Sequence, residues 1–167
     1  MAVKVSILMA VYNTAPYLPQ SLDSLLNQTM GDFQVICVDD ASTDDSLKVL
    51  ESYARRDSRI EVISLAENHG QAFARNQGLM RAQGTYTCFL DSDDWLMPDY
   101  VEKIALALEK ASEEPEMILV LPKIYHEESK VVKKWYDEDN FLTVFPEDGI
   151  IVNPARKPLL YQFEVNQ

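Results

Sequence analysis

Residues 3–11, VKVSILMAV, decide the fold class of this chain. The stretch is rich in β-branched residues and almost continuously apolar, a pattern typical of a strand that is covered on both faces. Three later segments repeat the pattern, namely 33–40, 60–65 and 86–94. The sequence therefore predicts four buried strands.

Amphipathic segments separate the predicted strands. Apolar residues at helical spacing predict three helices, over 16–28, 43–55 and 71–82. Ser42 or Thr43 can cap the second of these, and Pro98 with Asp99 opens a fourth helix over 98–110. Strand and helix alternate four times, which predicts an α/β fold with a mostly parallel, right-handed sheet and helices on both of its faces.

The composition limits the number of domains and the classes of partner. With 167 residues, 47% of them hydrophobic, the chain can bury one sizeable core, so we predict one domain with an appendage. Its 15 Lys and Arg residues against 27 Asp and Glu residues give a net charge of -12, which repels nucleic acid and anionic membrane surfaces. No apolar run approaches the roughly 20 residues that a membrane helix needs. We therefore expect neither a nucleic-acid partner nor a membrane span.

Cys37 and Cys88 both lie in apolar runs, without a CxxC motif or a His-rich neighbourhood. This context predicts buried, reduced thiols rather than a metal site or a redox pair. Reduced thiols suit the cytoplasm, and the start of the chain lacks the charged region of a signal peptide. We therefore expect a cytoplasmic protein.

The chain changes character near residue 112. Residues 1–112 hold the alternation of strands and helices and form the predicted α/β domain. In residues 113–167, the segment 116–126 can supply another strand, but the remainder is highly charged or rich in proline. We predict that 113–167 continues the same domain as a partial C-terminal appendage.

Polar residues follow each predicted strand at its carboxyl end. In an open parallel sheet ligands bind at this edge, because the loops converge where the strand order reverses. The residues delivered there are Tyr12 and Asn13, Asp39 and Asp40, residues 68–70, and residues 91–94. Acids directly after buried strands cost desolvation free energy, so they predict a binding site at this edge.

The acids in FLDSDDW, residues 89–95, predict a cation site. Carboxylate oxygens suit Mg²⁺ or Mn²⁺, which in phosphate chemistry take one or two protein carboxylates and complete their shell with phosphate and water. The Asp-x-Asp spacing lets one acid contact the metal while the other faces a ribose. The alternative is a turn at a strand–helix junction. Asp39 and Asp40 carry the same ambiguity, since Asp-Asp-x-Ser can also cap the next helix.

Two further residues at this edge have alternative interpretations. Arg75 can neutralise a phosphate from the first turns of its helix, or form a surface ion pair. Tyr12 can stack on a base, or belong to the core. A Walker loop and the GxGxxG, HExxH and GxSxG motifs are absent from the sequence, so other common chemistries find no support.

Three stretches taken together resemble a known family. In chain order they are VSILMAVYN, VICVDDASTDDS and NHGQAFARNQGLMRAQGTYTCFLDSDDW. They closely resemble the nucleotide-sugar-binding half of family-two glycosyltransferases, which have the GT-A fold, over about residues 3–112. The resemblance implies a Rossmann-like sheet and an inverting, metal-dependent enzyme. Such an enzyme transfers a sugar from a nucleoside diphosphate, with a UDP-sugar expected here, to a glycan or lipid-linked acceptor, as in polysaccharide biosynthesis.

The resemblance also implies roles for individual residues. The residues that it assigns to the nucleotide are Ala10, Tyr12, Asp39, Asp40, Asn68, Gly70, Arg75 and Asp91. Among these, Asp40 reads the base, Tyr12 frames it, and Arg75 lies near the phosphates. Asp93 is implied to bind Mn²⁺ or Mg²⁺, with Asp94 as a second metal or sugar contact. Family members often have proline where this chain has Ala10, which should alter the rigidity of the loop more than binding.

The family's catalytic base usually lies further downstream, often in a Glu-Asp pair. Here the pair Glu147 and Asp148 makes Asp148 a candidate, and a turn explains this pair as well. The chain ends without an obvious acceptor subdomain or the basic amphipathic helix that attaches many relatives to membranes. We therefore expect a truncated form of a protein that is peripheral at the inner face of the cell membrane when intact.

Two other function classes stay open. A nucleotide-sugar-binding module without turnover would have no carboxylate from 113–167 at the anomeric carbon. A phosphorylatable receiver domain also places acids after parallel strands, and Lys123 is a conceivable match for its lysine. That domain needs its acid pair after the first strand, however, where this chain has Tyr12 and Asn13.

Overall fold

The computed structural model describes the chain from residue 5 to residue 110 without a break. Beyond that point it describes 118–120, 123–126, 131–134 and 150–152. The chain forms two compact units, Met1–Glu102 and Lys103–Gln167. The predicted division into domains at residue 112 stays a prediction.

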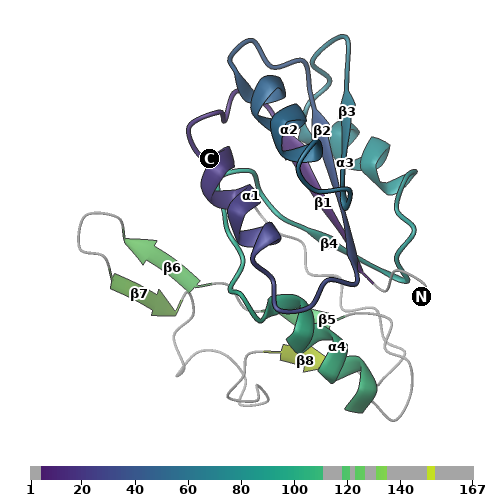
Figure 1. Ribbon diagram of the computed structural model, residues 1–167, viewed down its shortest axis with the longest axis vertical. Helices are drawn as coiled ribbons and strands as arrows, with labels where there is room; N and C mark the ends of the chain where they lie inside the picture. Colours follow the sequence, from purple (N-terminus) through teal and green to yellow (C-terminus); the bar gives the residue numbers. More distant parts are fainter. Residues whose placement is uncertain (1–4, 111–117, 121–122, 127–130, 135–149, 153–167) are drawn as a thin grey trace. The chain divides into compact units, whose positions relative to one another are not determined.

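The first unit is built on a four-stranded sheet (Figure 1). Its strands are β1 (Val5–Val11), β2 (Phe33–Asp39), β3 (Ile60–Ser64) and β4 (Tyr86–Phe89). They lie in the order β3-β2-β1-β4, and every neighbouring pair is parallel. The alternation of strands and helices predicted from the sequence is therefore confirmed.

Helices α1 (Leu18–Leu26), α2 (Ser46–Ala54) and α3 (Gln71–Leu79) connect the strands. Helices α1 and α2 contact each other, whereas α3 packs on β1 and β2. Right-handed connections explain this division, because the chain moves outward from β1 to β3 and then crosses back to β4. The helices therefore cover both faces of the sheet (Figure 1). A fourth helix, α4 (Tyr100–Lys110), follows β4 in the chain.

The interior of the sheet explains why the first two strands are apolar without alternation. On the face that α3 covers, Leu8, Ile36 and Val38 form a buried cluster with Ala74. Residues of the opposite strand face, such as Ile7 and Met9, are also fully buried. Both faces of β1 and β2 therefore exclude water, so their side chains are mostly apolar at either parity, and the buried hydroxyl of Ser6 donates to Gln34 Oε1 at 3.0 Å. The prediction of four buried strands is wrong for the two outer strands, since β3 is mostly half-buried and β4 alternates between half-buried and exposed residues.

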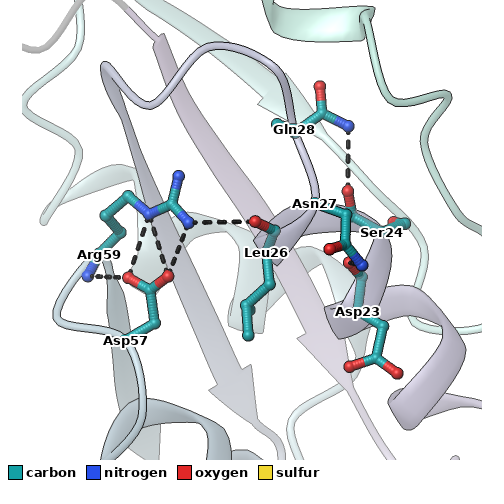
Figure 2. A network of polar contacts seen from close by, with 7 residues as sticks. All are labelled: Asp23, Ser24, Leu26, Asn27, Gln28, Asp57 and Arg59. Atoms are coloured by element: carbon teal, nitrogen blue, oxygen red, sulfur yellow. Dashed lines mark hydrogen bonds and ion pairs between the residues drawn. The ribbon is translucent and has the colours of Figure 1, made fainter.

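Polar contacts hold the amino-terminal edge of this sheet together (Figure 2). Arg59 donates from Nη2 to Asp57 Oδ2 at 2.6 Å and to the carbonyl of Leu26, at the end of α1, at 3.5 Å. The guanidinium of Arg59 lowers the pKa of Asp57. Just after α1, the side-chain amide of Asn27 donates to the carbonyl of Asp23, and that of Gln28 donates to the carbonyl of Ser24. These charged and amide side chains thus find hydrogen-bond partners within the protein.

Two further sequence predictions need correction. The strand predicted over 86–94 ends at Phe89, so the acids from Asp91 onward lie in the turn that follows β4. Ser42 and Thr43 do not cap α2, whose N-cap residue is Asp45 without a side-chain capping bond. The physical reason is that the segment before α2 is bonded instead to the loop after β1.

The two cysteines are free thiols, as predicted. Cys37 is fully buried, and burial raises its pKa to about 12. Cys88 is half-buried, and burial likewise raises its pKa. Both thiols are therefore protonated at neutral pH and poor nucleophiles.

The described parts of the second unit are four short strands. They are β5 (Ile118–Val120), β6 (Lys123–His126), β7 (Val131–Lys134) and β8 (Ile150–Val152). Strand β5 pairs with β8 and β6 pairs with β7, both antiparallel. The strand predicted over 116–126 therefore contributes to two separate pairings. Within the part of the chain that the structure describes, none of the helices has the length and apolar character needed to cross a membrane.

Candidate nucleotide and metal site

The carboxyl ends of the four parallel strands carry the predicted site residues. Strand β1 lies between β2, which is the next strand along the chain, and β4, which is the last of the four strands of this sheet in chain order. The strand order therefore reverses beside β1, which is where open α/β sheets bind ligands.

Asp40 joins three elements at this edge. Its side chain is 2% exposed, and its Oδ1 accepts the backbone N–H of His69 at 2.9 Å while its Oδ2 accepts that of Gly70 at 2.7 Å. The backbone N–H of Asp40 donates to the carbonyl of Val11 at 2.8 Å. Gly70 has a φ of 86°, which glycine adopts without strain, and it forms the N-cap of α3. The carboxylate thus ties the ends of β1 and β2 to the start of α3.

Asp39 is as buried as Asp40, but only one of its two carboxylate oxygens accepts a hydrogen bond from a described residue. Its Oδ2 accepts the backbone N–H of Ser42 at 3.2 Å. Its Oδ1 is buried and has no hydrogen-bond partner among the described residues. A buried acceptor without a donor is rare in native proteins, so this oxygen is suited to a donor that a ligand brings.

Asn13 is a polar residue of this edge to which the sequence assigns no role. Its backbone has a φ of 54°, and its Oδ1 accepts the N–H groups of Thr43 at 2.8 Å and of Asp44 at 3.3 Å. Its own N–H donates to Ser42 Oγ at 3.1 Å. The one signal in the sequence is the residue type, because asparagine tolerates positive φ better than most side chains.

Further hydrogen bonds join the loop after β1 to the start of α2 and the residues just before it. The N–H of Thr14 donates to Ser46 Oγ at 3.0 Å, and the N–H of Ala15 donates to Asp44 Oδ2 at 3.1 Å. Asp44 also accepts the N–H of Ser46 at 2.9 Å. Slight burial acts to raise the pKa of Asp44, but these hydrogen bonds outweigh it and lower the pKa. The loops after β1 and β2 therefore behave as one hydrogen-bonded unit.

Arg75 and Asp91 form an ion pair across the reversal point. Arg75 Nη2 lies 2.7 Å from Asp91 Oδ1, and the side-chain amide of Gln71 donates to the same oxygen at 3.2 Å. The guanidinium carbon of Arg75 lies 5.3 Å from the centre of the Phe89 ring. The structure thus brings together a residue expected near the phosphates and one expected near the ribose.

Asp93 and Asp94 are exposed in the turn after β4. The N–H of Asp94 donates to the carbonyl of Asp91 at 3.0 Å, which closes the turn. Partial burial raises the pKa of Asp94, and the negative charges of Asp93 and Asp91 raise it further. These carboxylates repel one another, and a cation would relieve that repulsion.

The described residues do not form a complete protein cage for a metal. Among them, no group of three or more His, Cys, Asp or Glu side chains is arranged to hold an ion. Mg²⁺ and Mn²⁺ bound beside phosphates often take only one or two carboxylates from the protein. The donor set of Asp93 and Asp94 fits this kind of site.

The remaining predicted residues take different places. Tyr12 is 47% exposed directly after β1, which leaves its ring free to contact a ligand. Ala10 packs against the buried cluster under α3, so only its backbone can serve the site. Asn68 accepts the N–H of Gly70 at 3.2 Å and supports the turn into α3. Asp148 lies outside the described residues, and Lys123 lies in β6 of the second unit.

Comparisons with known proteins show which family this chain resembles. Residues 6–164 match the family described as glycosyl transferase family 2. Over 115 residues the chain is 44% identical to the putative glycosyltransferase EpsH of Bacillus subtilis, an alignment that covers 69% of this chain and 32% of EpsH.

Solved structures show the same fold. S. aureus TarS in complex with UDP-GlcNAc aligns with a TM-score of 0.64 and 30% identity, over 70% of this chain and 33% of that one. The mannosyltransferase PcManGT from Pyrobaculum calidifontis, in complex with GDP-Man and Mn²⁺, aligns with a TM-score of 0.63 and 23% identity, over 76% of this chain and 37% of that one. The GT-A-like fold expected from the sequence is confirmed. The chain spans about a third of the length of each of these relatives.

Proposed function

The chain belongs to glycosyl transferase family 2, and we propose that it is the donor-binding part of an inverting, metal-dependent enzyme. The enzyme would transfer a sugar from a UDP-sugar to a glycan or lipid-linked acceptor. The observation that carries the proposal is the convergence of a buried acid pair, an arginine and an exposed acidic turn at one edge of the sheet. The UDP-GlcNAc bound to TarS, at 30% identity, supports UDP as the nucleotide.

The acid pair after β2 supports recognition of the base. A uracil ring carries an N–H donor between two carbonyl groups, and the buried Oδ1 of Asp39 lacks a donor among the described residues. Asp40 has lone pairs beyond the two that it uses for backbone N–H groups. The half-exposed ring of Tyr12 offers a surface on which the base can stack.

Arg75 and the acidic turn support binding of the diphosphate. A guanidinium makes paired hydrogen bonds to phosphate oxygens, so Arg75 can exchange Asp91 for a phosphate. Asp93 and Asp94 would hold Mn²⁺ or Mg²⁺. When bound, such an ion stabilises the negative charge that grows on the departing diphosphate.

Inversion also requires a base that removes the proton from the acceptor hydroxyl on the opposite face of the sugar. Its identity stays a prediction, and the candidate from the sequence, Asp148, lies outside the described residues. Residues 5–110 would therefore bind and orient the donor, and the acceptor side belongs to other parts of the protein.

Calorimetric titration of UDP, GDP and CDP in Mn²⁺ tests the proposal. We expect UDP to bind most tightly and Asp93→Ala to weaken UDP binding by roughly tenfold or more, because loss of even an outer-shell contact at a metal site costs roughly tenfold to a hundredfold. Asp32→Ala is the matched control, since Asp32 is an exposed acid just before β2 at the opposite edge of the sheet. Equal heats for wild type and Asp93→Ala would refute the metal assignment.

Donor hydrolysis measured in the same samples separates two functions. Release of the sugar from a UDP-sugar in Mn²⁺ supports a transferase. Metal-dependent binding without hydrolysis would instead favour a nucleotide-sugar-binding module without turnover. No binding of any of the three nucleotides would refute both.

A further inference from the structure

Asn13 connects the loop after β1 to the loop after β2. Its side-chain oxygen accepts the N–H groups of Thr43 and Asp44, and also the hydroxyl of Thr43 at 3.2 Å. Its backbone N–H donates to Ser42 Oγ. One residue therefore makes hydrogen bonds to three successive residues that lie about 30 positions further along the chain.

The backbone of Asn13 makes this geometry available. A φ of 54° lies in the left-handed region, where asparagine, aspartate and glycine are tolerated at low cost. Ala41, in the facing loop, has a φ of 57°. Each of the two loops thus contains one residue with positive φ, and the hydrogen bonds of Asn13 join the loops.

These bonds do not serve to cap a helix. Helix α2 begins at Ser46, with Asp45 as its N-cap residue. The groups that Asn13 accepts belong to Thr43 and Asp44, which precede the helix. The effect of Asn13 is therefore on the relative position of the two loops.

We propose that Asn13 is a positioning residue for recognition of the nucleobase. Tyr12 directly precedes it, and Asp39 and Asp40 directly precede the loop to which it is bonded. The bridge thus fixes the exposed ring of Tyr12 relative to the buried acid pair. This inference rests on the proposed function, because it concerns how that site discriminates between bases.

The test compares Asn13→Gly with Asn13→Asp in titrations with UDP and CDP in Mn²⁺. Glycine keeps the positive φ but removes the acceptor oxygen, whereas aspartate keeps both. For Asn13→Gly we expect UDP affinity to fall about tenfold, as loss of two or three hydrogen bonds predicts, and CDP affinity to fall less than about threefold. Asn13→Asp should retain the preference for UDP. A role in stability alone would lower the unfolding midpoint and leave the UDP-to-CDP ratio unchanged.

Two further variants keep the test decisive. Ser42→Ala removes only the acceptor of the Asn13 N–H, so it reports on the bridge even if Asn13→Gly fails to fold, with an expected loss of about threefold in UDP affinity. Asn27→Gly is the matched control, because that asparagine bonds within α1's own end, at the amino-terminal edge (Figure 2).

The outcomes separate this inference from the proposed function. If wild type binds UDP and both Asn13→Gly and Ser42→Ala keep its affinity and its preference over CDP, the inference is wrong and the proposed function stands. If wild type does not bind UDP in Mn²⁺, the proposed function fails and takes this inference with it.

Discussion

The acids that end β2 and the acids that follow β4 lie at the same edge of one sheet, yet their surroundings are opposite. Asp39 and Asp40 are 1% and 2% exposed, and three of their four carboxylate oxygens accept backbone N–H groups. Asp93 and Asp94 are exposed and lie close enough for the charge of Asp93 to raise the pKa of Asp94.

This difference separates two uses of a carboxylate. A buried carboxylate that accepts backbone N–H groups is part of the fold, because removing it leaves donors without partners. An exposed cluster of like charges costs stability and becomes favourable only when a cation binds. Asp91 lies between the two cases, since it is half-exposed but paired with Arg75. The same residue type thus holds the loops together in one place and is available to a ligand in the other.

The largest effect is expected from Asp40→Ala. The substitution leaves the N–H groups of His69 and Gly70 without acceptors inside the protein. Each orphaned donor costs on the order of 1–3 kcal/mol, so we expect a loss of about 3 kcal/mol in the free energy of unfolding, measured by urea denaturation. Asp93→Ala, the exposed counterpart, should change it by less than about 0.5 kcal/mol. Similar losses for the two variants would remove the distinction between the acid clusters.

A smaller effect is expected at the ion pair of Arg75 and Asp91. Both side chains are partly exposed, at 32% and 47%, so solvent screens their attraction. A double-mutant cycle with Arg75→Ala and Asp91→Asn should give a coupling of about 0.5 kcal/mol in the free energy of unfolding, and less in high salt. A coupling several times larger would place Asp91 with the buried acids.

The smallest effect is the pH dependence caused by Asp94. Partial burial and then the charges of Asp93 and Asp91 raise its pKa in the folded state above the ordinary value of 3.8. The folded protein therefore binds this proton more tightly than the unfolded chain does. The resulting loss of stability is fully present above the folded pKa and fades as the pH falls toward 3.8.

Without divalent cations, Asp94→Asn should thus be slightly more stable than wild type at pH 7, and the gap should close toward pH 4, as read from urea midpoints. Asp57→Asn is the control, because its effect on stability at pH 7 should have the opposite sign. Arg59 lowers the pKa of Asp57, so this substitution should cost stability at pH 7 and cost less as the medium becomes acidic. A gap for Asp94→Asn that does not depend on pH would contradict the repulsion inferred for the turn.

Particular elements show how far the sequence predicts the structure. The apolar run of β1 and the helical spacing of the leucines in α1 are local patterns, and both elements form where the patterns predict them. The strand predicted over 86–94 extends too far, because pattern alone does not show that backbone pairing stops near Leu90, whose N–H still donates to the carbonyl of Leu8. The cap predicted at Ser42 or Thr43 is wrong because those groups bond to a loop that the sequence places about 30 residues away.

The sequence by itself determined the alternation of strands and helices, the family, and the edge of the sheet at which the acids gather, because these depend on residue type and spacing. Only the tertiary structure decided which acids are buried and satisfied, which are exposed, and that Asn13 connects two loops. The partners of Asp40 lie 29 and 30 positions further along the chain. A carboxylate's environment depends on such distant donors, and folding alone brings them together.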